Sequence, residues 1–264
     1  MKVDTSSSLL RSITVQRRVI FALLMREIIT RYGRHNLGFM WLFLEPMLFT
    51  LGVTTLWTML KLTHGNGYSI AAFAVTGYSS ILLWRNCSNR VVGAIGPNLS
   101  LMHHRNVRVI DIYLSRLILE IAGATTSMIV LTLTFSSIGW MNLPDDVLIV
   151  AIGWFLLAWF AVGLSLIVGA ASERSEMVER VWHILTYLMF PLSGAAFLVD
   201  WFPASVQKLM LLVPMVHGTE MIRHGFFGTA VTTHEDPIYL LCINIVMTFL
   251  GLALVRETGR RLEQ

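Results

Sequence analysis

The chain of 264 residues is strongly apolar: 55% of its residues are hydrophobic, only 14% are charged, and the mean hydropathy is +0.66. Soluble domains carry about a quarter charged residues, so the composition excludes an ordinary soluble domain. The net charge of +4 does not indicate a nucleic-acid-binding protein, because the basic residues recur between apolar blocks, as they do in membrane proteins.

The N-terminal part, residues 1–37, is predicted to be cytoplasmic and to carry an amphipathic helix over residues 13–34. Apolar residues recur every four positions from Ile20 to Tyr32, and Arg26 lies on the opposite side. This pattern is typical of a helix that lies in the plane of the membrane surface; a plain basic lead-in is the alternative. Arginines interrupt the apolar part, which argues against a cleavable signal peptide.

Six later segments are apolar enough to be transmembrane helices, each of which needs about 20 residues. They occupy residues 39–60, 69–90, 117–138, 147–171, 181–199 and 238–255. We therefore predict an all-α integral membrane protein whose transmembrane domain covers residues 38–255, followed by a cytoplasmic tail over 256–264. The fifth segment contains Pro191 and Gly194, which interrupt a helix.

The basic residues predict the orientation of these helices. Seventeen of them fall in the N-terminal part, the tail and the connections on the same side, and three, Lys61, Lys208 and Arg223, fall on the other side. Cytoplasmic connections carry the excess of Lys and Arg, so both termini are predicted to be cytoplasmic. The two cysteines, Cys87 and Cys242, then lie at opposite sides, which argues against a disulfide.

Two connections are unusual. In the cytoplasmic connection 85–116, residues Asn98–Arg108 can form a short amphipathic helix capped by Asn98 or Ser100, suited to docking a cytoplasmic partner. An ordinary solvated loop is the alternative. The outer segment 200–237 contains an apolar run too short to span the membrane, so we predict a re-entrant half-helix, which requires protein or a watery cavity around it.

No catalytic constellation is present in the sequence. Gly163-Leu-Ser165 resembles the serine motif of intramembrane proteases only faintly, and no histidine in the last helix can pair with that serine. His217 with Glu220 lacks the further ligands of a metal site, as does the pair His103-His104. The phosphate-binding motif of ATPases is also absent, so any ATP must be bound by another chain.

Ionisable residues inside membrane segments are expensive and deserve a functional hypothesis. Glu120 is expected to pair with Arg116 one turn earlier in the same helix, which makes it structural. Glu45 has no local partner, so a contact with a neighbouring helix and a role in a transport pathway remain equal alternatives. The eight tryptophans lie mostly near helix ends, where an interfacial belt explains them; stacking on sugars is the alternative.

Several motifs together resemble a known family. They are Thr30-Arg31-Tyr32 at the end of the interfacial helix, Leu37-Gly38-x-x-Trp41 and Pro46 after it, the cytoplasmic helix Asn98–Arg108, and Pro214-x-x-His217-x-x-Glu220-x-x-Arg223 before the last span. Over nearly the whole chain, this pattern resembles the ABC-2 type permeases, most closely the Kps-type exporters of bacterial capsular polysaccharide. O-antigen and teichoic-acid exporters are relatives, and a drug or small-lipid exporter is a more distant alternative.

The resemblance implies a homodimer in the bacterial inner membrane with two copies of a cytoplasmic ATPase that binds ATP and Mg. It implies a lipid-linked acidic polysaccharide as substrate, a periplasmic co-polymerase protein and an outer-membrane exporter as further partners, and no metal, cofactor or catalytic residue in this chain. Its coupling helix, which docks on the ATPase, corresponds to Asn98, Leu99, Ser100, Leu101, Met102, His103, His104 and Arg105. Its interface helix corresponds to the segment with Arg17, Arg18, Arg26 and Arg31.

A substrate pathway can also be placed on this sequence. Arginines near the inner mouth can bind the phosphates and carboxylates of the glycan, although anchoring to lipid explains them equally well. The predicted pathway residues are Arg31, Arg34, Glu45, Arg85, Arg90, His217, Glu220 and Arg223. A secondary transporter is disfavoured because no internal repeat is visible. A scaffold protein would need no partner ATPase.

Overall fold

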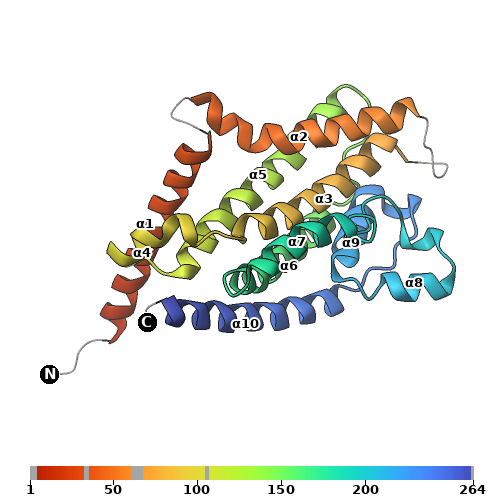
Figure 1. Cartoon of the computed structure of the whole chain (residues 1–264). Helices are drawn as coiled ribbons and strands as arrows, with labels where there is room; N and C mark the ends of the chain where they lie inside the picture. Colours follow the sequence, from red (N-terminus) through yellow and green to blue (C-terminus); the bar gives the residue numbers. More distant parts are fainter. Residues whose placement is uncertain (1–4, 33–35, 61–67, 105–106, 263–264) are drawn as a thin grey trace.

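The computed structural model describes residues 5–32, 36–60, 68–104 and 107–262, and the regular structure in these ranges is entirely helical (Figure 1). The long helices are α1 (Thr5–Tyr32), α2 (Asn36–Met59), α3 (Ile70–Val91), α5 (Val109–Ser137), α6 (Val147–Ser172) and α10 (Pro237–Leu262). The shorter ones are η1 (Gly96–Asn98), α4 (Leu99–His104), α7 (Glu176–Leu188), η2 (Val199–Trp201), α8 (Ala204–Met210), α9 (Pro214–Phe227) and η3 (Gly228–Ala230).

Helix α6 forms the centre of the bundle. It packs against α10, α9 and α3, while α5 packs against α3, α1 and α2. Its sequence is apolar on all sides, as expected of a helix surrounded by protein and lipid. Helix α4 and the end of α10 lie at one end of the bundle, and α8 and α9 lie at the other (Figure 1). We refer to these as the cytoplasmic and outer ends, following the predicted orientation.

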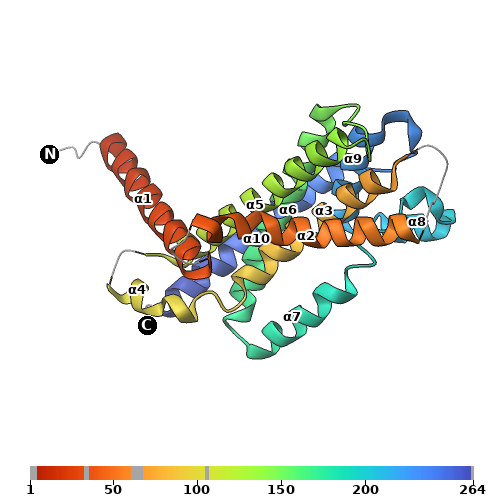
Figure 2. The ribbon, with the colours of Figure 1, turned by 90° about the horizontal axis from the view of Figure 1, so that it is seen from above.

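Three helices of the described part are long and apolar enough to cross a membrane: α5, α6 and α10. A shorter apolar stretch, Met47–Trp57, lies within α2. A helix is observed over most of the predicted segment 13–34, as α1, which begins earlier, at Thr5, and is described as far as Tyr32. It crosses the direction of the bundle at a steep angle (Figure 2).

The helix predicted over residues 181–199, with an interruption at Pro191 and Gly194, is observed only in part. Helix α7 ends at Leu188, and turns and bends follow as far as η2. Pro191 cannot continue the hydrogen-bonding pattern of a helix, and Gly194 has a φ of +79°, a left-handed conformation that glycine adopts without strain. Helix α7 lies to the side of the bundle (Figure 2) and exposes an apolar face that includes Val181 and Ile184.

The tryptophans divide into two groups. Trp41, Trp140 and Trp201 are exposed, as an interfacial belt requires, whereas others are inside the protein. Within the bundle, Trp154 of α6 donates a hydrogen bond to Thr125 of α5, and Trp159 of α6 donates one to Thr248 of α10; both N–H···O distances are 2.9 Å. The interfacial belt therefore accounts for only part of the set, because indole N–H groups also connect neighbouring helices.

Both cysteines are free, with Cys87 buried in α3 and Cys242 exposed on α10. The expectation that they do not form a disulfide is confirmed.

Candidate functional site

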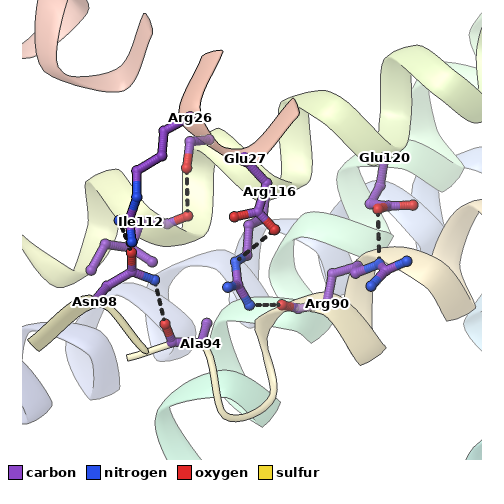
Figure 3. Close-up of polar contacts among 9 residues, drawn as sticks. Arg26, Glu27, Arg90, Ala94, Asn98, Ile112, Arg116 and Glu120 are labelled. Atoms are coloured by element: carbon purple, nitrogen blue, oxygen red, sulfur yellow. Dashed lines mark hydrogen bonds and ion pairs between the residues drawn. The ribbon is translucent and has the colours of Figure 1, made fainter. Parts of the chain in front are cut away.

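A network of polar side chains connects α1 to the segment that carries α4 (Figure 3). Arg26 of α1 donates a hydrogen bond from Nη1 to Oδ1 of Asn98, at 2.6 Å. The Nδ2 group of Asn98 in turn donates to the carbonyl oxygen of Ala94, at 2.8 Å. Asn98, which with Ser100 is one of the two predicted cap residues, directly precedes α4, and its buried amide joins α1 to the chain that leaves α3.

A second connection joins α1, α5 and α3. Arg116 of α5 forms an ion pair with Glu27 of α1, with 3.5 Å between Nε and Oε1. Its Nη1 group also donates to the carbonyl oxygen of Arg90, at 2.8 Å, near the end of α3. The arginine therefore holds the ends of two helices against a third (Figure 3). Both side chains of the ion pair are largely shielded from solvent, which strengthens their interaction.

The predicted pairing of Glu120 with Arg116 is wrong. Glu120 is buried and pairs instead with Arg90 of α3, with 3.1 Å between Nε and Oε1. The i, i+4 spacing only makes the local pair possible. The packing of α3 against α5 brings Arg90 to Glu120, and the packing of α1 against α5 brings Glu27 to Arg116. Arg90 is thus neutralised by a carboxylate, which weakens its case as a free anion-binding residue of the pathway.

A third connection lies at the start of α5. The carboxylate of Asp111 accepts hydrogen bonds from the N–H of Arg108 and from Nε2 of Gln16 in α1, both at 3.0 Å. The acid therefore stabilises the first turn of α5, as an acidic residue at the third helical position does, and simultaneously holds α1.

The carboxylate of Glu173, at the end of α6, accepts a hydrogen bond from the N–H of Ile95, at 3.3 Å. Burial raises the pKa of Glu173 above its ordinary value, the nearby carboxylate of Glu179 raises it further, and the Ile95 N–H opposes the rise. The segment between α3 and α4 is therefore held from α6 as well as from α1.

The predicted coupling residues occupy a helix shorter than expected, because α4 ends at His104. Leu99 and Ser100 are exposed, whereas Leu101 and Met102 are partly buried against the core. The side chains of His103 and His104, and the whole of Arg105, lie outside the described residues. Leu99 and Ser100 are thus the predicted coupling residues whose side chains face away from the bundle.

The predicted interface residues Arg17 and Arg18 are exposed on α1. Arg17 borders a cavity of about 500 Å³ between α1 and α5 that is otherwise lined mainly by apolar side chains, including Ile20 and Ile118. Of the predicted pathway residues, Arg34 and the side chains of Arg31 and Glu45 lie outside the described residues.

The predicted pathway residue Arg85 stacks on an aromatic ring. Its guanidinium lies 4.5 Å from the centre of the Tyr187 ring and so connects α3 to α7. A cation over an aromatic face contributes about 0.5–2 kcal/mol, depending on how far it is removed from water.

At the outer end, the buried guanidinium of Arg223 in α9 donates to the carbonyl oxygens of Gly194, Ala195 and Phe197. It also lies over the ring of Phe73 in α3, 3.8 Å from the ring centre. This single side chain therefore holds the irregular stretch that follows α7 against both α9 and α3.

The other two predicted residues of α9 are bonded to backbone groups as well. Glu220 accepts from the N–H groups of Val199, at 3.3 Å, and His234, at 3.2 Å. His217 bonds through Nε2 to the carbonyl oxygen of Leu211, at 2.7 Å, and its Nδ1 accepts from the N–H of Asp236, at 2.9 Å.

The three side chains of the motif follow one face of α9 at intervals of three residues, and all are buried. Apart from Nε of Arg223, which has no hydrogen-bond partner among the described residues, their polar atoms bond to main-chain groups of residues 194–199 and 211–236. This is the arrangement of a structural scaffold. Within the described residues, no group of three His, Cys, Asp or Glu side chains is placed to hold a metal ion.

Sequence reasoning missed Gln16, Glu27 and Asp111 of the cytoplasmic network, and Glu173. Acidic residues that lie near seventeen basic ones in the predicted cytoplasmic parts indicate that ion pairs form there. Which residues pair depends on how the helices pack.

Comparison with known proteins gives a consistent result. Residues 18–227 match the family model described as ABC-2 type transporter. The chain is 47% identical to the capsule polysaccharide export inner-membrane protein CtrC of Neisseria meningitidis serogroup B, over 100% of this chain and 99% of that protein. It is 42% identical to the protein of the same description, BexB, of Haemophilus influenzae, with the same coverage. The polysialic acid transport protein KpsM of Escherichia coli is 28% identical over 92% of this chain and 94% of its own length.

Proposed function

The chain belongs to the ABC-2 type transporter family, and on that basis we propose that it is the permease subunit of an ATP-driven exporter of lipid-linked capsular polysaccharide in a bacterial inner membrane. The observation that carries this proposal is similarity over the full length, at 42–47% identity, to proteins named for capsule polysaccharide export. Exporters of O-antigen or teichoic acid are the second candidates within the same family.

The topology that we propose has six crossings and cytoplasmic termini. Helices α5, α6 and α10 provide three crossings by length and composition. Helices α2 and α3 provide two more, and α7 with the irregular stretch after it provides the remaining one. An interrupted crossing is tolerable because Arg223 satisfies the carbonyl groups that the missing helical turns leave free. The seventeen basic residues of the predicted cytoplasmic side support this orientation.

Coupling to ATP hydrolysis is proposed to pass through α4. Two copies of a cytoplasmic ATPase, which bind ATP and Mg, would dock on the exposed Leu99 and Ser100 in each subunit of a homodimer. A push on α4 acts on Asn98, and the Arg26–Asn98 hydrogen bond transmits it to α1. The Arg116 contacts transmit it further to α3 and α5. These connections make α4 part of one unit with three helices.

The substrate pathway is proposed to lie between the two subunits, opened by this motion. The acidic glycan would enter from the cytoplasmic leaflet past Arg31, Arg34, Arg85 and Arg90, of which the side chains of Arg85 and Arg90 are described. Arg85 and Arg90 contribute less free charge than expected, because one stacks on Tyr187 and the other pairs with Glu120. A periplasmic co-polymerase protein and an outer-membrane exporter would receive the glycan.

The test is deletion and complementation in an encapsulated host bacterium. We expect deletion to abolish surface capsule while lipid-linked glycan accumulates inside the cell, and the reintroduced chain to restore export and co-purify with a separate ATPase. If the deletion strain has a normal capsule but less surface O-antigen or teichoic acid, the exported glycan is that polymer and not the capsule. Purification of an active chain without any ATPase would contradict the transporter assignment itself.

A further inference from the structure

A cavity of about 470 Å³ lies between the start of α5 and the cytoplasmic end of α10. Three exposed arginines border it, one at the N-cap of α5 and two on α10, and the other lining residues are mostly apolar. The three are Arg108, Arg256 and Arg260. Arg256 and Arg260 belong to none of the predicted coupling, interface or pathway residues, and Arg108 is the last residue of the predicted docking segment Asn98–Arg108.

The lining of the cavity has two parts, one of apolar side chains and one of arginines. Leu252, Arg256 and Arg260 follow one another at intervals of four residues on α10, so they lie on one face of the helix, each a turn nearer the cytoplasmic end. Leu252 and the buried Val255 line the part nearer the membrane, and Val109 of α5 completes the apolar wall. The arginines therefore gather where a membrane-crossing helix leaves the hydrocarbon region.

Within the described part of the chain, none of these three arginines forms an ion pair. The nearest acid on α10, Glu257, pairs with Arg174, at 2.8 Å, and with Arg261, at 2.5 Å. Asp111 of α5 is bonded to backbone and to Gln16. Three cations thus surround an apolar cavity without a counter-charge from the acids beside them.

We propose that this cavity binds one anionic phospholipid of the cytoplasmic leaflet. The phosphodiester is held by charge-assisted hydrogen bonds from Arg108, Arg256 and Arg260, and an acyl chain lies along Leu252 and Val255. A free phosphate would leave the apolar wall unused, and an uncharged lipid would leave the arginines unused. An anionic lipid complements both parts of the lining.

The position of the site gives the lipid a route to the transport machinery. Met102, in the last turns of α4, and Val107, just before α5, both line the cavity. A lipid bound here touches the coupling helix, the start of α5 and the end of α10 together. It thereby fixes the position of α4 relative to the bundle, whichever glycan the protein exports.

Native mass spectrometry of the purified full-length protein in a neutral detergent tests this proposal. The probes are phosphatidylglycerol, phosphatidylcholine and glycerol 1-phosphate, which separate headgroup charge from acyl chains. We expect one tightly bound phosphatidylglycerol for each chain and no comparable binding of the other two. Arg256→Gln together with Arg260→Gln should weaken binding by about fivefold for each arginine removed.

The matched control is Arg180→Gln together with Arg261→Gln, which removes two charges from the same side and leaves Glu257 paired with Arg174. This control should bind phosphatidylglycerol like the parent, and both variants should melt like the parent in neutral detergent. Equal binding of phosphatidylcholine, or equal loss in both variants, would overturn the site. Tight binding of glycerol 1-phosphate would show an anion site without a lipid. Binding of an acidic peptide from the ATPase in preference to phosphatidylglycerol would show a protein-docking site.

Discussion

Arg26 and Asn98 are joined by a hydrogen bond of 2.6 Å, although 72 positions separate them in the chain. One residue belongs to the helix predicted to lie at the membrane surface, and the other directly precedes the helix predicted to meet the ATPase. The bond makes these two elements neighbours that cannot move independently without breaking it.

We expect Arg26→Gln to reduce export several-fold while ATP hydrolysis by the assembled complex persists, so that less glycan is exported for each ATP. A hydrogen bond to a charged group contributes about 1.5–3 kcal/mol when it is shielded, and less here because Arg26 is exposed. Arg26→Lys should restore part of the coupling. The control is Arg180→Gln, whose ion pair stays within α7. Equal export per ATP in the two glutamine variants would contradict the role of the bond.

Double-mutant cycles distinguish the two possible partners of Glu120. Combining Arg90→Gln with Glu120→Gln should give an interaction energy above about 0.5 kcal/mol in the free energy of unfolding, because the pair is in contact. The same cycle with Arg116→Gln should give a value near zero, since Arg116 contacts Glu27 and the Arg90 carbonyl group instead. The two cycles are compared by thermal or denaturant unfolding in detergent. A larger interaction energy for the Arg116–Glu120 cycle than for the Arg90–Glu120 cycle would instead support the local pair that the sequence suggests.

Gly77→Ala should prevent accumulation of folded protein. A Cβ atom at this position in α3 would lie 2.2 Å from the carbonyl oxygen of Ala195 and 2.8 Å from Nη2 of Arg223. Gly52→Ala in α2 is the control, because nothing lies within 4 Å of its added Cβ and alanine is the better helix former by about 1 kcal/mol. Detergent-soluble yield and apparent melting temperature measure both. A well-folded Gly77→Ala protein would contradict the close approach of these segments.

Arg223→Lys separates a structural role from a pathway role. Lysine keeps the charge but lacks the planar fork that reaches three carbonyl oxygens, so buried acceptors are left unsatisfied at about 1–3 kcal/mol each. We expect a clear fall in apparent melting temperature and in protein level. Lys208→Gln on α8 is the control with little effect. A stable Arg223→Lys protein that cannot export would instead support the pathway role.

Stability should fall as the pH rises because of Glu173, whose pKa lies above its ordinary value of 4.5 in the folded protein. The folded state then binds the proton more tightly than the unfolded state, so stability is lost between pH 4.5 and the raised pKa. Glu173→Gln keeps an acceptor for the Ile95 N–H and removes the charge. Its melting temperature should exceed that of the parent at neutral pH and vary less with pH. Glu176→Gln, with a side chain 89% exposed, should retain the pH dependence of the parent.

The parts of the fold that depend on composition were predictable. Runs of apolar residues suffice to locate α5, α6 and α10, because hydrocarbon excludes charge over a fixed length. Pro191 and Gly194 indicate the interruption within residues 181–199, but not the path that the chain takes after Leu188. The break after Leu188 is stabilised by Arg223, a residue that comes 35 positions later, and no local pattern reveals that partner.

The polar site shows the same limit. Local rules assign Asn98 to a helix cap and Glu120 to Arg116, and both choices are reasonable within one turn of helix. The packing of α1 and α3 against α5 adds Arg26 as a partner of Asn98 and makes Arg90, rather than Arg116, the partner of Glu120. The sequence therefore indicated the types of residue that form the network. It did not indicate which of them form pairs.

Helix α9 holds the stretch over residues 194–199 in part through main-chain atoms: Arg223 binds carbonyl oxygens of that stretch, and Glu220 binds the N–H groups of Val199 and His234. Such bonds do not depend on the identity of the side chains at Phe197, Val199 or His234. Phe197 and Val199 are nonetheless buried together with Val216 of α9, and the side chain of His234 bonds to Asp200, so other contacts constrain these three side chains. The exposed side chains around this support can change without breaking its main-chain bonds, whereas a change at the buried positions would leave a cavity or a clash.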